Sequence, residues 1–317
     1  MKKVYLSLLM AVFMVVLVAC GSNEESTSDS NSDSEEAKNS TVVVEHELDT
    51  TEVTKNPEKV VVFDFGSLDT LDSLGVDVVG VPQMNIPRYL EKYAGDEYEN
   101  VGSLKEPDFE KIAEINPDLI IISTRQAELY DQLAEIAPTI FLQLDTSDYM
   151  ESFKRNANIL GEIFGKESEV EEALAEIDET VAAVKEKAEA NGQKGLIILA
   201  NDDKISAYGP SSRFGFIHDV LGVEPVDEGI EASTHGMNVS FEYVVDQDPE
   251  IIYVIDRTAV VGGETSAKDL VENQLVERTQ AYQNDNIYYL DPDYWYLSGG
   301  GLVSVPKMIE EIDASLE

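Results

Sequence analysis

The sequence predicts an α/β protein of two lobes that are joined by one long helix. Three observations support this prediction. Short runs rich in Val and Ile alternate with stretches of helical spacing, which is the pattern of parallel strands covered by helices. A long amphipathic stretch, 166–191, interrupts this alternation near the middle of the chain. One segment of sequence also occurs twice, once on each side of that stretch, as expected for two related lobes.

Strand and helix signals alternate in the N-terminal half. The run KVVVFDF, Lys59–Phe65, is rich in β-formers, and Leu68, Leu71 and Leu74 then give a helical spacing that Gly75 ends. The remaining elements expected here are a strand at 76–82, a helix at 108–115, a strand at 119–123, a helix at 127–137 and a strand at 139–142.

The stretch 166–191 predicts a connecting helix. Apolar residues recur there at intervals of three and four positions: Val170, Leu174, Ile177, Val181, Val184 and Ala188. At 1.5 Å per residue such a helix would be about 37 Å long, which suits a rigid strut between two lobes. It ends at Asn191 and Gly192.

The alternation resumes after this helix. The elements expected are a strand at 196–200, helices at 214–221 and 241–245, a strand at 251–255, a helix at 267–270, a strand at 287–290 and a last helix from about 302. The chain therefore divides into an N-terminal α/β lobe at 41–165, the connecting helix at 166–191 and a C-terminal α/β lobe at 192–317.

The first forty residues are expected to lie outside the fold. Residues 1–20 combine two lysines, an apolar run and the end LVAC, which is the pattern of a lipoprotein signal peptide. Cys20 is the only cysteine of the chain and stands where a lipid would be attached. Residues 21–40 are almost wholly polar, so we expect a disordered linker there.

The chain is strongly acidic, with a formal net charge of −41. Nucleic acid is therefore excluded as a partner, because its phosphates would be repelled. The charge itself indicates a solvated acidic surface and not a particular chemistry. The chain has only six arginines but sixteen lysines, so arginines that recur at matching positions indicate a function.

The repeated segment is DFEKIAEINPDLIIISTR at 108–125 and SFEYVVDQDPEIIYVIDR at 240–257. Each copy begins with a helix-capping residue, continues through a short helix to a proline, and then forms an apolar strand. The arginine that ends each copy, Arg125 or Arg257, follows the carboxyl end of its strand, where ligands of α/β sheets bind. We expect the two arginines to face each other across a cleft between the lobes.

Long stretches of the chain resemble one family of transport proteins. They are YGPSSRFGFIHDVLG at 208–222, STHGMNVSFEYV at 233–244, VIDR at 254–257 and YYLDPDYWYLSGGG at 288–301. With the repeated pattern, the long helix and LVAC, they look like the substrate-binding lipoproteins of ferric-siderophore ABC importers, within the iron-siderophore/cobalamin-type family. The match is nearest to its petrobactin-type, catecholate-binding branch.

This resemblance implies a binding protein and not an enzyme. It implies two Rossmann-like lobes, a rigid connecting helix and a ligand cleft between the lobes, with Arg213 as a third cleft arginine. The expected ligand is an anionic ferric siderophore, either a catecholate or a mixed catecholate–citrate, and no cofactor is implied. The protein would be exported, lipid-anchored to the outer face of the cell membrane, monomeric, and would deliver its ligand to an ABC permease dimer.

Three further side chains of the resembling stretches are candidate ligand contacts. Trp295 and Tyr296 precede three glycines that would allow a close approach, although a tryptophan is equally expected in a core. His235 and Tyr296 carry donor atoms that ligate Fe(III), so they could fill two positions that a four-coordinate siderophore leaves open. The alternative for His235 is a hydrogen-bonded loop residue.

Acidic residues at equivalent places could contact the permease. The resemblance implies one exposed acidic residue per lobe for this contact, and Glu110 and Glu242 occupy matching positions in the two copies. Glu106 competes with Glu110 for the first-lobe role. Favourable charge at a helix N-terminus would explain both glutamates without a partner.

Other functions remain as alternatives. A haem or corrinoid carrier could use the same scaffold but would not need three arginines. A carrier of free Zn or Mn is disfavoured by three scattered histidines. A siderophore-ester hydrolase would need a catalytic serine, and no G-x-S-x-G motif occurs.

Overall fold

The structure, a computed structural model, describes residues 40–317. The expected signal peptide with Cys20, and the expected linker except for its last residue, lie outside that range. Within the described part of the chain, no helix is both long and apolar enough to cross a membrane.

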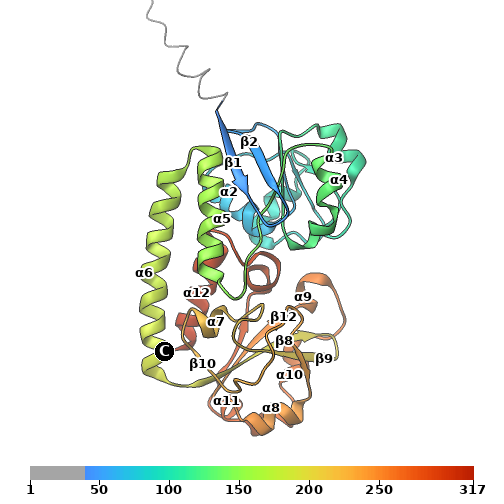
Figure 1. Cartoon of the computed structure of the whole chain (residues 1–317). Helices are drawn as coiled ribbons and strands as arrows, with labels where there is room; N and C mark the ends of the chain where they lie inside the picture. Colours follow the sequence, from blue (N-terminus) through green and yellow to red (C-terminus); the bar gives the residue numbers. More distant parts are fainter. Residues whose placement is uncertain (1–39) are drawn as a thin grey trace, which may run out of the picture.

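A five-stranded parallel sheet forms the centre of the N-terminal lobe, with strand order β5-β4-β3-β6-β7. The strands are β3 (Val60–Val62), β4 (Gly80–Val81), β5 (Glu99–Asn100), β6 (Leu119–Ile122) and β7 (Thr139–Phe141). The helices are α2 (Phe65–Ser73), α3 (Phe109–Ile115), α4 (Tyr130–Ala134) and α5 (Tyr149–Phe164), with 3₁₀ turns η1 (Arg88–Ala94) and η2 (Thr124–Leu129). An antiparallel hairpin, β1 (Thr41–Glu45) and β2 (Thr50–Thr54), lies on this lobe (Figure 1).

A mixed sheet forms the centre of the C-terminal lobe, in the order β11-β9-β8-β12-β13, with β10 beside β8. The strands are β8 (Lys194–Asn201), β9 (Lys204–Tyr208), β10 (Glu224–Pro225), β11 (Met237–Val239), β12 (Ile251–Asp256) and β13 (Ile287–Leu290). The helical segments are α7 (Phe216–Asp219), α8 (Phe241–Gln247), α9 (Thr258–Val261), α10 (Ala267–Val271), η3 (Val276–Arg278), α11 (Gln280–Gln283), η4 (Asp293–Ser298) and α12 (Ser304–Ser315). Strands β9 and β11 are antiparallel to their neighbours, whereas the other pairs are parallel.

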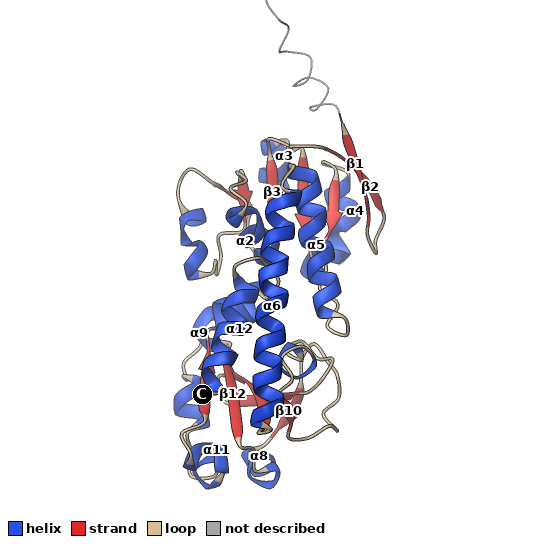
Figure 2. Ribbon diagram, turned by 90° about the vertical axis from the view of Figure 1, so that its left-hand side faces the viewer, coloured by secondary structure: helices blue, strands red, loops and turns tan. Residues whose placement is uncertain are grey.

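Helix α6 (Glu167–Asn191) runs along both lobes, as Figures 1 and 2 show from two sides. It packs against α5 of the N-terminal lobe and α12 near the C-terminus. The predicted apolar stripe faces this packing, since Val170, Ile177 and Val184 are buried. The helix ends at Gly192, which has the left-handed backbone that favours glycine. The predicted fold class, two α/β lobes with a long connecting helix, is confirmed.

Some expected elements differ from the structure. The expected helix at 127–137 is divided into η2 and the short α4, and the expected helix at 214–221 is reduced to α7. The hairpin of β1 and β2, the antiparallel strands β9 and β11, and helix α5 are additions. Strand β9 has polar side chains on one face, so its apolar signal in the sequence is weak.

The two copies of the repeated segment have the same local structure. In each, a helix (α3 or α8) leads to the strand beside the edge strand of its sheet (β6 or β12). Asp108 and Ser240 cap the helices, because their side chains accept backbone N–H groups at 2.9 Å and 3.4 Å. Asn116 and Asp248 end the helices in the left-handed conformation. The copies therefore place a strand end at the same point in each lobe.

Candidate functional site

A polar cavity of about 220 Å³ lies in the C-terminal lobe. Its lining is mostly polar and includes three cationic side chains. The lining residues are Leu199, Asn201, Lys204, Ser206, Tyr208, Arg213, Thr234, His235, Asn238, Arg257 and Tyr296. The cavity is smaller than the ligand pockets of about 300–1,000 Å³ that are common in proteins, so it would hold one part of a larger ligand.

One face of the sheet forms the floor of this cavity. Lys204, Ser206 and Tyr208 are alternate residues of β9 and line the cavity, whereas Ile205 and Ala207 between them are buried in the core. The pairing of β9 continues the same face on both sides, through the neighbouring residues of β8 and β11. The antiparallel extension of the sheet thus supplies a row of hydrogen-bonding groups.

Tyr296 connects two of the predicted arginines. Arg257 donates from Nε to the Tyr296 hydroxyl at 2.8 Å and from Nη1 to Asn201 Oδ1 at 2.5 Å. Arg213 donates from Nη2 to the Tyr296 carbonyl at 2.7 Å, and its guanidinium carbon lies 4.3 Å from the Tyr296 ring centroid. This stacking and hydrogen bonding fix both guanidinium groups at one wall of the cavity.

The arginines also alter the acidity of Tyr296. Burial alone would raise the pKa of the phenol, but the hydrogen bond from Arg257 and the charges of both arginines outweigh it. The net result is a pKa of Tyr296 below its usual range. Tyr296 lies in η4, a wide π-helical turn of a kind that is frequent at functional sites.

The cations of the cavity have no acidic partners. Within residues 40–317, no carboxylate forms an ion pair with Lys204, Arg213 or Arg257. Most other cations of this acidic chain do have such a partner, for example Arg88 with Asp293. Unpaired positive charge gathered in one cavity is suited to an anionic ligand.

Arg125 approaches this group from the N-terminal lobe. It lies in η2, is exposed, and is not part of the cavity wall. Burial first, and the positive charge of Arg125 second, lower the pKa of Arg213, so the two guanidinium groups repel each other across the lobes. The charge of Arg125 also lowers the pKa of the half-buried Asp64 at the start of α2, although desolvation raises that pKa overall.

His235 and Tyr296, the two candidate iron ligands, line the same cavity. His235 is exposed, and its backbone N–H donates to Ser233 Oγ at 3.1 Å. The ring of His235 has no hydrogen bond within the described residues, so it is available to a ligand. No group of three or more His, Asp or Glu side chains suited to a metal ion occurs in residues 40–317.

Trp295 is not part of the cavity. It is buried, with 3% of its surface exposed, and packs against Phe216. Its indole N–H donates to the Glu311 carboxylate at 2.6 Å. The expectation that Trp295 contacts the ligand therefore does not agree with its place in the core, although Tyr296 is the next residue of the chain.

The three candidate docking residues are exposed on the surface of the two lobes. Glu110 and Glu242 lie in the first turns of α3 and α8, and Glu106 lies in the loop before α3. None of the three forms an ion pair within the described residues. Their positions agree equally with docking and with helix N-terminal electrostatics.

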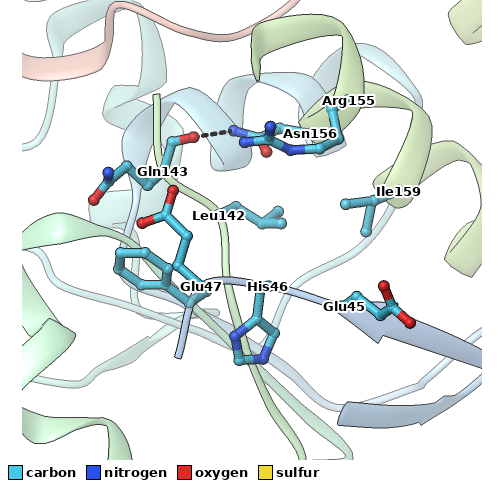
Figure 3. A pocket seen from close by; sticks show the side chains of 9 residues that line it. Glu45, His46, Glu47, Leu142, Gln143, Arg155, Asn156 and Ile159 are labelled. Atoms are coloured by element: carbon cyan, nitrogen blue, oxygen red, sulfur yellow. Dashed lines mark hydrogen bonds between the residues drawn. The ribbon is translucent and has the colours of Figure 1, made fainter. Parts of the chain in front are cut away.

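A second cavity, of about 300 Å³, lies in the N-terminal lobe (Figure 3). The end of β1, the end of β7 and helix α5 surround it. Arg155, two glutamates and apolar side chains share its wall, and Asn156 donates to the Gln143 carbonyl at 3.1 Å. None of the residues that the sequence singled out lies there.

Several lining residues were not predicted from the sequence. They are Leu199, Asn201, Lys204, Ser206, Tyr208, Thr234 and Asn238. The alternation of polar and apolar residues in KISAY, 204–208, is the signal that could have indicated a strand with one polar face.

The family of the chain follows from comparison with known proteins. The family described as periplasmic binding protein matches residues 60–294. The chain belongs to this family. Petrobactin-binding protein YclQ of Bacillus subtilis is 52% identical over the full length of both chains. Its crystal structure has a TM-score of 0.86 with 54% identity, covering 88% of this chain and 99% of that one.

A more distant relative has the same fold. The periplasmic catecholate-siderophore binding protein VctP of Vibrio cholerae is 34% identical, with a TM-score of 0.83. The match covers 87% of this chain and 100% of that chain. The family members named here are binding proteins.

Proposed function

We propose that this protein captures an anionic ferric siderophore outside the cell and delivers it to an ABC permease. The ligand would be a catecholate or a mixed catecholate–citrate, in agreement with what the relatives YclQ and VctP are named for. The observation that carries the proposal is the cavity in which Lys204, Arg213 and Arg257 have no acidic partner, in a chain of net charge −41.

Arginine suits such a ligand for physical reasons. A ferric catecholate complex is a multiply charged anion with clustered oxygens, and a guanidinium offers a rigid fork of donors that stays charged. Each charge-assisted hydrogen bond contributes about 1.5–3 kcal/mol. Salt screens charges beyond about 8–10 Å, so the acidic surface repels the ligand only weakly from a distance and the nearby arginines dominate.

The protein would complete the iron coordination where the siderophore supplies only four donors. His235 and Tyr296 share one cavity and provide an imidazole nitrogen and a phenol oxygen. The Tyr296 oxygen accepts one hydrogen bond, from Arg257, and keeps a further lone pair for the metal. Arg125 would add charge from the opposite lobe.

Delivery requires an anchor and a docking surface. We propose that a lipid on Cys20 holds the monomeric protein at the outer face of the membrane, with residues 21–40 as the tether. Glu110 and Glu242, one on each lobe, would contact the permease dimer, with Glu106 as the competing residue of the first lobe.

A fluorescence titration tests the proposal. Trp295 is the only tryptophan and lies next to Tyr296 in the chain, so a coloured ferric complex in the cavity should quench it. We expect stoichiometric quenching by ferric catecholates, weak quenching by neutral ferric hydroxamates, and no product. Ferric citrate alone serves as the third probe.

Variants identify the cause of the binding. Arg213→Ala should weaken binding of the ferric catecholate, whereas Arg278→Ala, an exposed arginine outside the cavity, should leave it unchanged. Equal losses for charged and neutral ferric ligands in Arg213→Ala would contradict the charge-based proposal. Hydrolysis of the siderophore by the purified protein would indicate an enzyme instead.

A further inference from the structure

The segment that carries Tyr296 lies between the two lobes. It comprises residues 291–304, from the end of β13 through η4 to the start of α12, and is part of the red region between the lobes in Figure 1. One side of the segment holds Tyr296 against Arg213 and Arg257 of the C-terminal lobe. Its other side contacts the N-terminal lobe.

Side chains of η1 attach to this segment from the N-terminal lobe. Arg88 donates to Asp291 at 2.8 Å and to the buried Asp293 at 2.5 Å, shortly before Tyr296 in the chain. The Tyr89 hydroxyl is hydrogen-bonded to Ser298 Oγ at 2.7 Å, shortly after it. These contacts hold the segment on both sides of Tyr296.

A buried carboxylate of α2 completes the attachment. Asp69 has no exposed surface and accepts the backbone N–H groups of Val303 and Ser304, at 3.1 Å and 3.0 Å, at the start of α12. It also accepts the Tyr89 hydroxyl at 2.9 Å. Burial raises the pKa of Asp69 to about 6, although these hydrogen bonds oppose the shift.

The glycines of the segment make this contact possible. A Cβ atom at Gly301 would overlap the Asp69 carboxylate, and one at Gly300 would overlap Leu144. The Tyr149 hydroxyl of α5 donates to the Gly299 carbonyl at 2.7 Å. Gly300 and Gly301 therefore let the backbone of the C-terminal segment lie directly against the N-terminal lobe.

We infer that Tyr89 and Asp69 are positioning residues for Tyr296, through which the N-terminal lobe sets the geometry of the arginine cluster. Neither residue lines the cavity. Both determine where the π-helical turn lies, and Tyr296 orients Arg213 and Arg257 from that turn. Affinity for the ligand then depends on how the lobes are seated against each other. This inference rests on the proposed function, because it concerns the same cavity.

The chain offers a closely matched control for Tyr89. Tyr93 lies one turn further along η1, and its hydroxyl donates to Asp72 of α2 at 2.9 Å, just as the Tyr89 hydroxyl donates to Asp69. The Tyr93 contact stays within the N-terminal lobe. Tyr89→Phe and Tyr93→Phe therefore remove equivalent hydroxyl groups, of which only one reaches the Tyr296 segment.

The experiment measures ferric catecholate affinity and the emission of Trp295 without ligand. We expect Tyr89→Phe to weaken binding roughly fivefold, the scale of one hydrogen bond, and to shift the Trp295 emission. Tyr93→Phe should alter neither. Ser298→Ala removes the other partner of the same hydrogen bond and should weaken binding by the same factor. The double variant Tyr89→Phe/Ser298→Ala should bind no more weakly than either single variant.

Two outcomes would overturn the inference. Equal affinities and emission in Tyr89→Phe and Tyr93→Phe would show that the lobe contact does not reach Tyr296. Fully additive losses in the double variant would show that Tyr89 and Ser298 act separately. If the wild-type protein bound no ferric catecholate, the proposed function would fail, yet the Trp295 emission of the variants would still test the positioning role.

Discussion

The two copies of the repeated segment form the same helix and strand but leave their arginines in different situations. Arg257 is partly buried, and Tyr296 and Asn201 accept its N–H groups. Arg125 is exposed, and its side chain forms no hydrogen bond or ion pair within the described residues. One copy therefore provides a guanidinium that neighbouring side chains hold in place, and the other provides one that they do not hold.

This difference arises from the local structure at the carboxyl end of each strand. Arg257 comes directly after β12 and lies beside the polar floor of the C-terminal sheet. Arg125 is the second residue of the 3₁₀ turn η2. The side chains of Ser123 and Gln126 cap this turn, because each bonds to the backbone of the other residue. A preorganised cation loses little side-chain entropy on binding, whereas a mobile one must be ordered by the ligand. The C-terminal lobe should therefore supply most of the affinity.

Removing the preorganised arginine should have the largest effect. Arg257→Ala eliminates a ligand contact and releases Tyr296 and Asn201, so we expect ferric catecholate affinity to fall about 100-fold, which corresponds to about 3 kcal/mol. Titration of Trp295 fluorescence measures this. Arg257→Lys keeps the charge but cannot reach both partners, and it should recover only a small part of the loss. Full recovery would show that charge alone matters.

The fold was more predictable from the sequence than the site. The apolar stripe of α6 and the repeated helix–Pro–strand units are local patterns, so their positions could be predicted directly. The floor of the cavity could not, because Lys204 and Asn238 become neighbours of Arg257 only through the antiparallel pairing of β9 and β11. The burial of Trp295 likewise depends on tertiary contacts, with Phe216 in the core and with the Glu311 carboxylate.

Removing the exposed arginine, Arg125, should have a smaller effect. Arg125→Ala eliminates a charge that reaches the ligand from the other lobe, and it also relieves the repulsion that lowers the pKa of Arg213. We expect affinity to fall about tenfold and the loss to shrink at high salt, because an exposed charge is screened. Titrations at low and high ionic strength measure both. A loss as large as that of Arg257→Ala would remove the distinction between the two copies.

The glutamates of the two copies should affect transport and not binding. We expect Glu110→Ala and Glu242→Ala each to reduce uptake of the ferric ligand by cells roughly two- to fivefold, with unchanged affinity of the purified proteins. Glu172→Ala, exposed on α6, is the control. If Glu106→Ala reduced uptake and Glu110→Ala did not, docking would not use equivalent positions of the repeat.

The caps of the two copies should show the smallest effect. Asp108 accepts its backbone N–H at 2.9 Å and carries a negative charge at the helix N-terminus, whereas neutral Ser240 accepts at 3.4 Å. Replacing either by Ala should lower the free energy of unfolding by about 1 kcal/mol, with the larger loss at Asp108. Urea unfolding measures the difference, which should narrow in high salt. A larger loss at Ser240 would mean that the C-terminal copy is stabilised through its cap, and not only through the contacts that hold Arg257.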